Sequence, residues 1–175
     1  MKSIPAIKPL SALCIVLTIA FCDSPISSSP RPADGGDEKL MLDLKLMDLD
    51  GKPFDASKLK GSIVVLDFWA TWCKPCINEI PDLNRLQEKY AAKGLKVVGV
   101  TMASGAAPEV KPLLPRLKMQ YTVLMGDDNQ SYYLNIMGYP TTYLVTRDWK
   151  IRERYIGAGP MKAKNLEAAI QKLLD

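Results

Sequence analysis

An unbroken apolar segment that runs directly into two closely spaced cysteines constrains this chain more than any other feature. Residues 63–68 (IVVLDF) are apolar except for Asp67 and show no alternation of apolar and polar positions. This pattern is typical of a central strand that is buried on both faces. Cys73 and Cys76 follow, and a helical pattern begins between them. Because a helix N-terminus carries unpaired N–H groups and the positive end of the helix dipole, it stabilises a thiolate and lowers the pKa of the thiol.

The absence of histidine and the number of cysteines narrow the chemistry further. The chain of 175 residues contains no histidine, which excludes His-based acid–base catalysis and Cys/His triads and removes the commonest metal ligand. Two of the four cysteines, Cys14 and Cys22, lie in the apolar N-terminal region, which leaves Cys73 and Cys76. Such a pair is either redox-active or half of a zinc site, and zinc needs two more ligands that the domain lacks. We therefore expect no metal and no cofactor.

Length and charge favour one domain that binds neither nucleic acid nor a membrane surface. A chain of this length with 47% hydrophobic residues can bury one ordinary core. The formal net charge is +4, and it falls to +2 without residues 1–22, which contain Lys2 and Lys8 and no acidic residue. That charge is too small to indicate a polyanionic partner.

The N-terminal region predicts export. Residues 1–22 combine a basic start with an apolar run over residues 10–21, which is too short for a transmembrane helix of about 20 residues and fits a secretory signal. Ile19–Cys22 resembles a bacterial lipobox, in which the cysteine is lipidated, although Phe21 stands where that pattern has a small residue. Ordinary cleavage after the cysteine and an uncleaved anchor are the alternatives. Residues 23–39, rich in Ser, Pro, Gly and Asp, predict a flexible linker.

Residues 40–175 predict an α/β fold with a mixed β-sheet flanked by helices. Apolar residues alternate near residue 44, and Asp50-Gly51 indicates an N-terminal β-hairpin. A helix from the cysteines to Gly94, which Pro81 should kink, separates two strands and implies a right-handed crossover between parallel strands. The other expected elements are a strand over 95–101, a proline-interrupted and partly helical segment over 103–119, a strand over 121–125, a short helix over 131–137, a hairpin of 142–146 with 151–156, and a closing helix from Pro160.

Two motifs that lie far apart in the sequence together resemble the thioredoxin superfamily. One runs from Asp67 through Cys76 to Pro81, and the other, GYPTT at residues 138–142, is similar to the superfamily's cis-proline loop. The exported N-terminus, the hairpin and an extra βα segment near residues 97–119 resemble the extracytoplasmic TlpA/ResA-like branch of thiol–disulfide oxidoreductases. The resemblance implies a thioredoxin-like fold. Lys-Pro replaces the Gly-Pro that thioredoxin has between its cysteines, so the resemblance implies no particular redox potential.

The cysteine pair suggests a mechanism that agrees with this resemblance. Cys73, exposed at the helix N-terminus, would attack a partner's disulfide to form a mixed disulfide, which Cys76 would resolve. A static structural disulfide is the alternative, but it would close almost no loop and would stabilise the fold little. Lys74 would favour the Cys73 thiolate or else be an ordinary solvated lysine. Pro75 would shape the start of the helix.

Two carboxylates are candidate proton carriers in a chain without histidine. Asp67 lies in the apolar strand, so burial should raise its pKa, and it matches the buried aspartate that thioredoxin uses to move a proton to or from the inner cysteine. A structural, hydrogen-bonded aspartate is the alternative. Glu79, three residues after Cys76, matches an acidic residue that TlpA/ResA-like reductases place by the active site. An ordinary surface position is the alternative for Glu79.

The residues expected to contact a substrate flank the cysteines. With a cis peptide bond, as in the resembling family, Pro140 would press its loop against the disulfide and leave the backbone of Tyr139 free to pair with an extended substrate. Trp72 and Trp69 would form an apolar docking surface, although Trp69 could equally be a core residue. Lys74 and Pro75 complete the rim of this expected site.

The favoured interpretation is an exported, membrane-tethered thiol–disulfide oxidoreductase that acts as a reductant. It would take electrons from a membrane thiol reductase and pass them to cysteine pairs of exported proteins, and the resemblance implies apocytochromes c among these. A monomer is expected. The alternatives are a disulfide oxidant or isomerase of the same fold, a thiol peroxidase, which the strict C-x-x-C spacing disfavours, and a non-catalytic metal chaperone, for which a histidine beside the cysteines would be expected.

Overall fold

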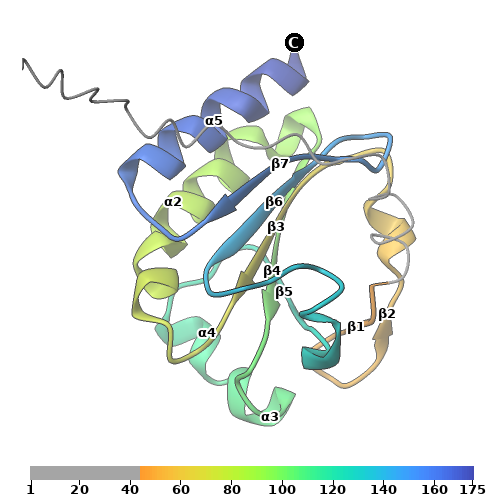
Figure 1. Cartoon of the computed structure of the whole chain (residues 1–175), viewed down its shortest axis with the longest axis vertical. Coiled ribbons are helices and arrows are strands. Elements are labelled where there is room, and N and C mark those ends of the chain that lie inside the picture. The colour runs from red at the N-terminus through yellow and green to blue at the C-terminus, as the bar shows by residue number, and fades with distance from the viewer. Residues whose placement is uncertain (1–43) are drawn as a thin grey trace, which may run out of the picture.

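The protein is organised around one seven-stranded mixed sheet (Figure 1) in the computed structural model, which describes residues 44–175. The predicted leader, its cysteines and the linker lie outside the described residues. The strands run in the order β2-β1-β5-β4-β3-β6-β7, and only the pairs β3–β4 and β4–β5 are parallel. Their bounds are β1 Leu46–Met47, β2 Pro53–Phe54, β3 Ile63–Trp69, β4 Leu95–Thr101, β5 Thr122–Met125, β6 Thr141–Val145 and β7 Ile151–Ile156. The predicted mixed sheet, hairpin and parallel crossover are confirmed.

Helices cover both faces of this sheet. The longest are α2 (Lys74–Tyr90) and α5 (Pro160–Leu174), which lie side by side against one face in Figure 1. The shorter helices are η1 Ala56–Leu59, η2 Ala91–Lys93, α3 Ala107–Val110, α4 Leu113–Arg116 and η3 Asp128–Gln130. Within residues 44–175, none of the helices combines the length and the apolar character needed to cross a membrane.

Strand β3 lies at the centre of the core because both of its faces are covered. All seven of its residues are buried, including Asp67. Ile63 and Val65 pack in one core cluster with residues of α2 and α5, whereas Val64 and Leu66 pack in a second cluster on the opposite face. Since side chains alternate along a strand, this division explains why the segment is apolar at nearly every position.

The start of α2 follows directly from the local sequence. Cys73 is the N-cap residue and its sulfur accepts a hydrogen bond from the backbone N–H of Cys76. Pro75 stands in the first turn, where a missing N–H costs nothing. The helix continues through Pro81, so the kink expected there remains a prediction. Gly94, at φ 90°, ends the following short helix η2 in the left-handed conformation that glycine adopts readily.

Helices were also predicted within residues 103–119 and over residues 131–137. The segment over residues 103–119 is partly helical as expected, because α3 and α4 are separate short helices with Pro112 capping the second. The predicted short helix over residues 131–137 is wrong. Only η3 precedes this stretch, and residues 131–135 form turns that include Asn135 at φ 49°. A residue in the left-handed region cannot continue a right-handed helix.

Candidate active site

The two cysteines of the C-x-x-C motif form a disulfide at the N-terminus of α2, with Cα atoms 5.3 Å apart. Cys73 is only 4% exposed and Cys76 only 1% exposed. The expectation of an exposed Cys73 is therefore wrong for the disulfide state. The reason is that both cysteines belong to a small apolar cluster with Trp69, Ala70 and Val123.

An aromatic pair lies beside the disulfide. Trp72 is 66% exposed, and its indole N–H donates a hydrogen bond of 2.8 Å to the carbonyl of Ala103. Its ring meets the ring of Tyr139 edge-on at a centroid distance of 5.9 Å. Trp69, by contrast, is fully buried in the core. Of the two tryptophans, only Trp72 is exposed enough to contact a partner.

The second predicted motif closes over the first. The Tyr139–Pro140 peptide bond is cis, as expected. The loop is held by a hydrogen bond of 2.7 Å from the Thr141 hydroxyl to the Gly138 carbonyl. Tyr139 packs against the cluster that contains both cysteines, so the fold brings together two motifs that are more than fifty residues apart in the sequence.

A buried cluster of charged side chains joins β3, α2 and α5. Asp67 on β3 is 1% exposed and accepts a hydrogen bond of 2.6 Å from the hydroxyl of Thr142, its register partner on β6. Glu79, one turn after Cys76 on α2, is 7% exposed. Both Glu79 carboxylate oxygens bind the ammonium of Lys162 on α5, at 2.8 and 3.0 Å. The same ammonium lies 3.9 Å from Oδ1 of Asp67. The surface alternative for Glu79 is wrong.

Burial changes the acidity of both carboxyl groups. It raises the pKa of Asp67, although Lys162 and the Thr142 hydrogen bond oppose the shift. Burial, followed by the charge of Asp67, raises the pKa of Glu79 to about 8, again against the effect of Lys162. Both carboxyl groups face the same ammonium, which binds Glu79 and lies 3.9 Å from Asp67. Two carboxyl groups that interact through one ammonium titrate as a pair, and the raised pKa values favour protonation within this pair.

The sequence identified both carboxylates but missed Lys162. This lysine is 83 residues from Glu79, and it is one of several lysines in a helix whose apolar stripe gives no sign of an inward-facing charge. The only sequence signal is its position two residues after Pro160, in the first turn of α5. Helix packing, which local sequence does not encode, turns it toward α2.

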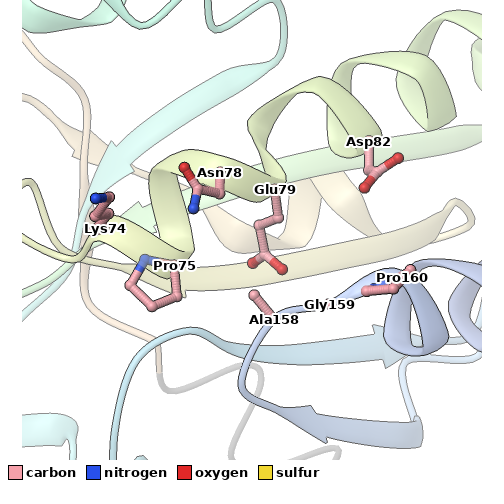
Figure 2. A pocket seen from close by; sticks show the side chains of 8 residues that line it. All are labelled: Lys74, Pro75, Asn78, Glu79, Asp82, Ala158, Gly159 and Pro160. Atoms are coloured by element: carbon pink, nitrogen blue, oxygen red, sulfur yellow. The ribbon is translucent and has the colours of Figure 1, made fainter.

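Glu79 also borders an open groove of about 470 Å³ between α2 and the loop from β7 to α5. Figure 2 shows Glu79 pointing from α2 toward Ala158 and Gly159 on that loop, with Lys74 and Pro75 at the end of the groove nearest the cysteines. The remaining lining residues are Asn78, Asp82 and Pro160. Because Glu79 lines this groove and Asp67 is fully buried, Glu79 is the member of the pair that can exchange protons with solvent.

This arrangement supports two-electron thiol chemistry. Within residues 44–175 there is no group of three Cys, His, Asp or Glu side chains that could hold a metal ion. What the site does contain is a dithiol/disulfide pair at a helix N-terminus, a cis-proline loop against it and a buried acid pair that can bind or release a proton. A thioredoxin-like sheet carrying such a pair defines a thiol–disulfide oxidoreductase.

Comparison with known sequences leads to the same class. The sequence profile of the AhpC/TSA family matches residues 38–154, and this chain belongs to that thioredoxin-like family. The thioredoxin-like protein YneN of Bacillus subtilis is 35% identical over 127 residues, which cover 71% of this chain and 73% of that protein. The thiol-disulfide oxidoreductase ResA of Bacillus cereus is 33% identical over 127 residues, which cover 72% of each chain.

Solved structures agree on the fold. The thiol:disulfide interchange protein DsbE from Chlorobium tepidum superposes with a TM-score of 0.69 at 29% identity, covering 77% of this chain and 96% of that one. A secreted disulfide oxidoreductase of Mycobacterium tuberculosis has a TM-score of 0.64 at 21% identity, covering 81% of this chain and all of that one. At that lower identity the likeness shows the fold alone.

Proposed function

We propose that this protein is an exported, membrane-tethered reductant of cysteine pairs in exported proteins, with apocytochromes c among its substrates. The observation that carries the proposal is the Cys73–Cys76 disulfide at the N-terminus of α2, packed against the cis-proline loop. The relatives named ResA and DsbE support the extracytoplasmic assignment. A membrane thiol reductase would return the pair to the dithiol form after each turnover.

The exchange proceeds in two steps. In the reduced enzyme the Cys73 thiolate attacks a substrate disulfide, one substrate sulfur leaves as a thiolate, and a mixed disulfide forms. The Cys76 thiolate then attacks Cys73 Sγ, which releases the second substrate sulfur and leaves the enzyme as a disulfide. Two electrons pass from the enzyme dithiol to the substrate. The N-terminus of α2 favours the Cys73 thiolate, because its N–H groups and dipole attract negative charge.

The carboxyl pair supplies the proton acceptor for the second step. Cys76 must lose its proton before it attacks, and Glu79 lies one turn further along the same helix. Residues three positions apart on a helix are neighbours on one face. Asp67 is linked to Glu79 through Lys162, whose ammonium lies 3.9 Å from Asp67 and binds both Glu79 oxygens, and the groove beside Glu79 returns the proton to water.

Substrate recognition takes place on the exposed side of the disulfide. Trp72 and the ring of Tyr139 form an apolar contact surface, and the Tyr139 backbone pairs with an extended substrate segment next to Pro140. Lys74 and Pro75, both exposed, form the opposite rim. Since both cysteines are buried in the disulfide state, a partner must bring its own sulfur to a surface made by these neighbouring residues.

Three segments of the chain have separate roles in this proposed function. Residues 1–22 act as a signal peptide or lipoprotein leader, residues 23–39 as a flexible linker, and residues 40–175 as the catalytic thioredoxin-like domain. A linker with this composition holds the domain away from the membrane and lets the site reach different partners. The domain acts as a monomer.

The test is the reduction potential of the Cys73–Cys76 pair in the full-length protein. Glutathione or dithiothreitol buffers set the potential, and tryptophan fluorescence with thiol trapping reports the state of the pair. A potential near the thioredoxin value of about −270 mV is expected for a reductant. A potential near about −120 mV would identify an oxidant, and the absence of a reversible couple would contradict the proposed activity altogether.

Substrate docking on Trp72 has a separate test. The substitution Trp72→Ala removes the exposed ring and should lower kcat/KM for a protein disulfide about three- to tenfold, the worth of one aromatic contact. Exchange with oxidised glutathione, which is too small to need this surface, should stay the same. Met47→Ala, at an exposed apolar position near the other edge of the sheet, is the matched control. Equal losses with both substrates would place Trp72 outside the docking surface.

A further inference from the structure

The side chain of Lys162 is buried between the two carboxyl groups of the candidate site. It is 10% exposed, it binds both oxygens of Glu79, and it lies 3.9 Å from Asp67. A lysine is rarely this buried unless it is paired. Here one ammonium meets two carboxyl groups, so the cluster has one acid group more than it has cations.

We propose that Lys162 is a positioning residue that holds the Asp67–Glu79 pair at one bound proton, so that the pair keeps a vacant site for the proton of Cys76. This inference rests on the proposed exchange mechanism and adds to it a residue of α5. The carboxyl pair can accept the proton of Cys76 because Lys162 keeps one of the two carboxyl groups ionised near neutral pH.

The net charge of the Asp67, Glu79 and Lys162 cluster depends on how many protons the two carboxyl groups hold. With one proton on the pair, the Lys162 ammonium and one carboxylate cancel. Removing that proton would leave a second buried carboxylate without a cation, and adding another would leave a buried ammonium without an anion. Both states carry an uncompensated charge in the protein interior, which is costly. The state with one proton is therefore favoured over both neighbouring states.

The other groups that face the cluster do not change this balance. Thr142 on β6 is neutral and donates to Asp67. Tyr121, just before β5, has a buried hydroxyl without a hydrogen-bond partner among residues 44–175, and burial together with the two carboxylates raises its pKa. Asp82, a turn along α2, has an ion pair of 3.7 Å with Arg85. Lys74, at the far end of the groove, is exposed.

The proton balance of the resolving step shows what Lys162 contributes. The Sγ–H bond of Cys76 breaks and its proton moves to the vacant carboxylate. The Cys76 sulfur then bonds to Cys73 Sγ, and the electron pair of the broken mixed disulfide leaves on the substrate thiolate. The pair, now carrying two protons, returns one to water through the groove beside Glu79. Without Lys162 the pair would already hold two protons at neutral pH.

The experiment compares Lys162→Met with Lys164→Met, which removes an exposed lysine from the same helix. Each reduced full-length protein is mixed with oxidised glutathione, quenched with acid and analysed by mass spectrometry between pH 5 and 10. Removing the cation raises the pKa of the carboxyl pair. The resolving step of Lys162→Met should therefore slow about tenfold at pH 7. In a plot of its rate against pH, the rising limb should lie about one pH unit higher than in the wild type. Lys164→Met should match the wild type, and Lys162→Arg should restore the profile.

Further measurements separate this role from a structural one and from the proposed function. The first step, isolated by combining Cys76→Ser with each lysine substitution, should be unaffected by Lys162→Met. An unshifted pH profile in folded Lys162→Met would overturn the proposal while leaving the exchange activity in place. If Lys162→Met does not fold, carboxyl ¹³C NMR of the wild type decides, because the proposal requires one proton on the pair at pH 7. Two protons or none would overturn it.

Discussion

The contact between α2 and α5 carries two carboxylates with opposite behaviour. Near the cysteines, Glu79 of α2 binds Lys162 of α5, and its pKa is raised to about 8. At the other end, Glu167 of α5 binds Arg85 and Lys89 of α2 at 2.8 and 2.9 Å, and its pKa is lowered to about 2. Each carboxylate has a cation within hydrogen-bonding distance, yet their acidities shift in opposite directions.

The difference shows that a cationic partner alone does not decide the charge of a carboxyl group. Glu167 has two cations and a hydrogen bond from the Tyr90 hydroxyl, and its side chain is 19% exposed. Glu79 has one cation, greater burial, and a second carboxyl, that of Asp67, near the same ammonium. Burial and the like charge outweigh one ammonium, whereas two cations outweigh modest burial. The first arrangement can exchange a proton near neutral pH, and the second serves the packing of two helices.

The largest expected difference between the two ends is in activity. Glu79→Gln removes half of the proposed proton acceptor, so exchange with oxidised glutathione at pH 7 should slow about ten- to hundredfold, less than the full worth of a general base because Asp67 remains. Glu167→Gln should leave the rate unchanged. Stopped-flow tryptophan fluorescence of each reduced variant measures this. Equal rates for both variants would remove Glu79 from the chemistry.

The two ends should also give stability the opposite dependence on pH. The pKa of Glu79 is higher in the folded state, so its contribution to stability is complete below about pH 4.5 and is lost as the pH rises through about 8. The pKa of Glu167 is lower when folded, so its contribution is present above about pH 4.5 and is lost as the pH falls through about 2. Glu79→Gln should flatten the alkaline decline, and Glu167→Gln the acid decline.

Urea unfolding of the oxidised protein between pH 2 and 10 measures both effects. We expect about 1 to 3 kcal/mol from the buried Glu79 and about 1 kcal/mol from the more exposed Glu167. The difference in stability between the wild type and Glu167→Gln should shrink as the pH falls toward 2. If the free energy of unfolding of the two variants depended on pH in the same way, the two ends of the helix contact would not differ in their effect on stability.

A smaller effect is expected when Asp67 loses its charge, because the pKa of Glu79 should then move toward its ordinary value. Asp67→Asn removes the like charge beside Glu79, so the pKa of Glu79 should fall below 8 by about one unit and remain above its ordinary value, because burial, the larger cause, stays. Carboxyl ¹³C NMR of the oxidised variant follows the titration of Glu79. The substitution Asp82→Asn, at a neighbouring exposed position of α2, is the control. A Glu79 pKa that Asp67→Asn leaves in place would show that Asp67 carries no charge in this state.

The spacing of apolar residues predicted most of the fold, because this spacing is regular in the longer strands and helices. Residues 63–68 are apolar because β3 is covered on both faces, and the spacing of Ile80, Leu83 and Leu86 matches the buried face of α2. The failed prediction at residues 131–137 concerns a stretch with a weak signal, where the left-handed Asn135 ends any helix. Element boundaries shifted by about one residue, as at the start of β6.

The sequence by itself determined the chemistry of this protein, because the C-x-x-C pair, the missing histidine and the acid in an apolar strand can each be read without a structure. Only the tertiary structure decided which groups surround that chemistry. It buried Cys73, separated Trp69 from Trp72, and brought Lys162 from α5 to Glu79. The physical reason is that solvent exclusion and charge contacts depend on how α2, α5 and β3 pack together, and these elements are distant in the chain.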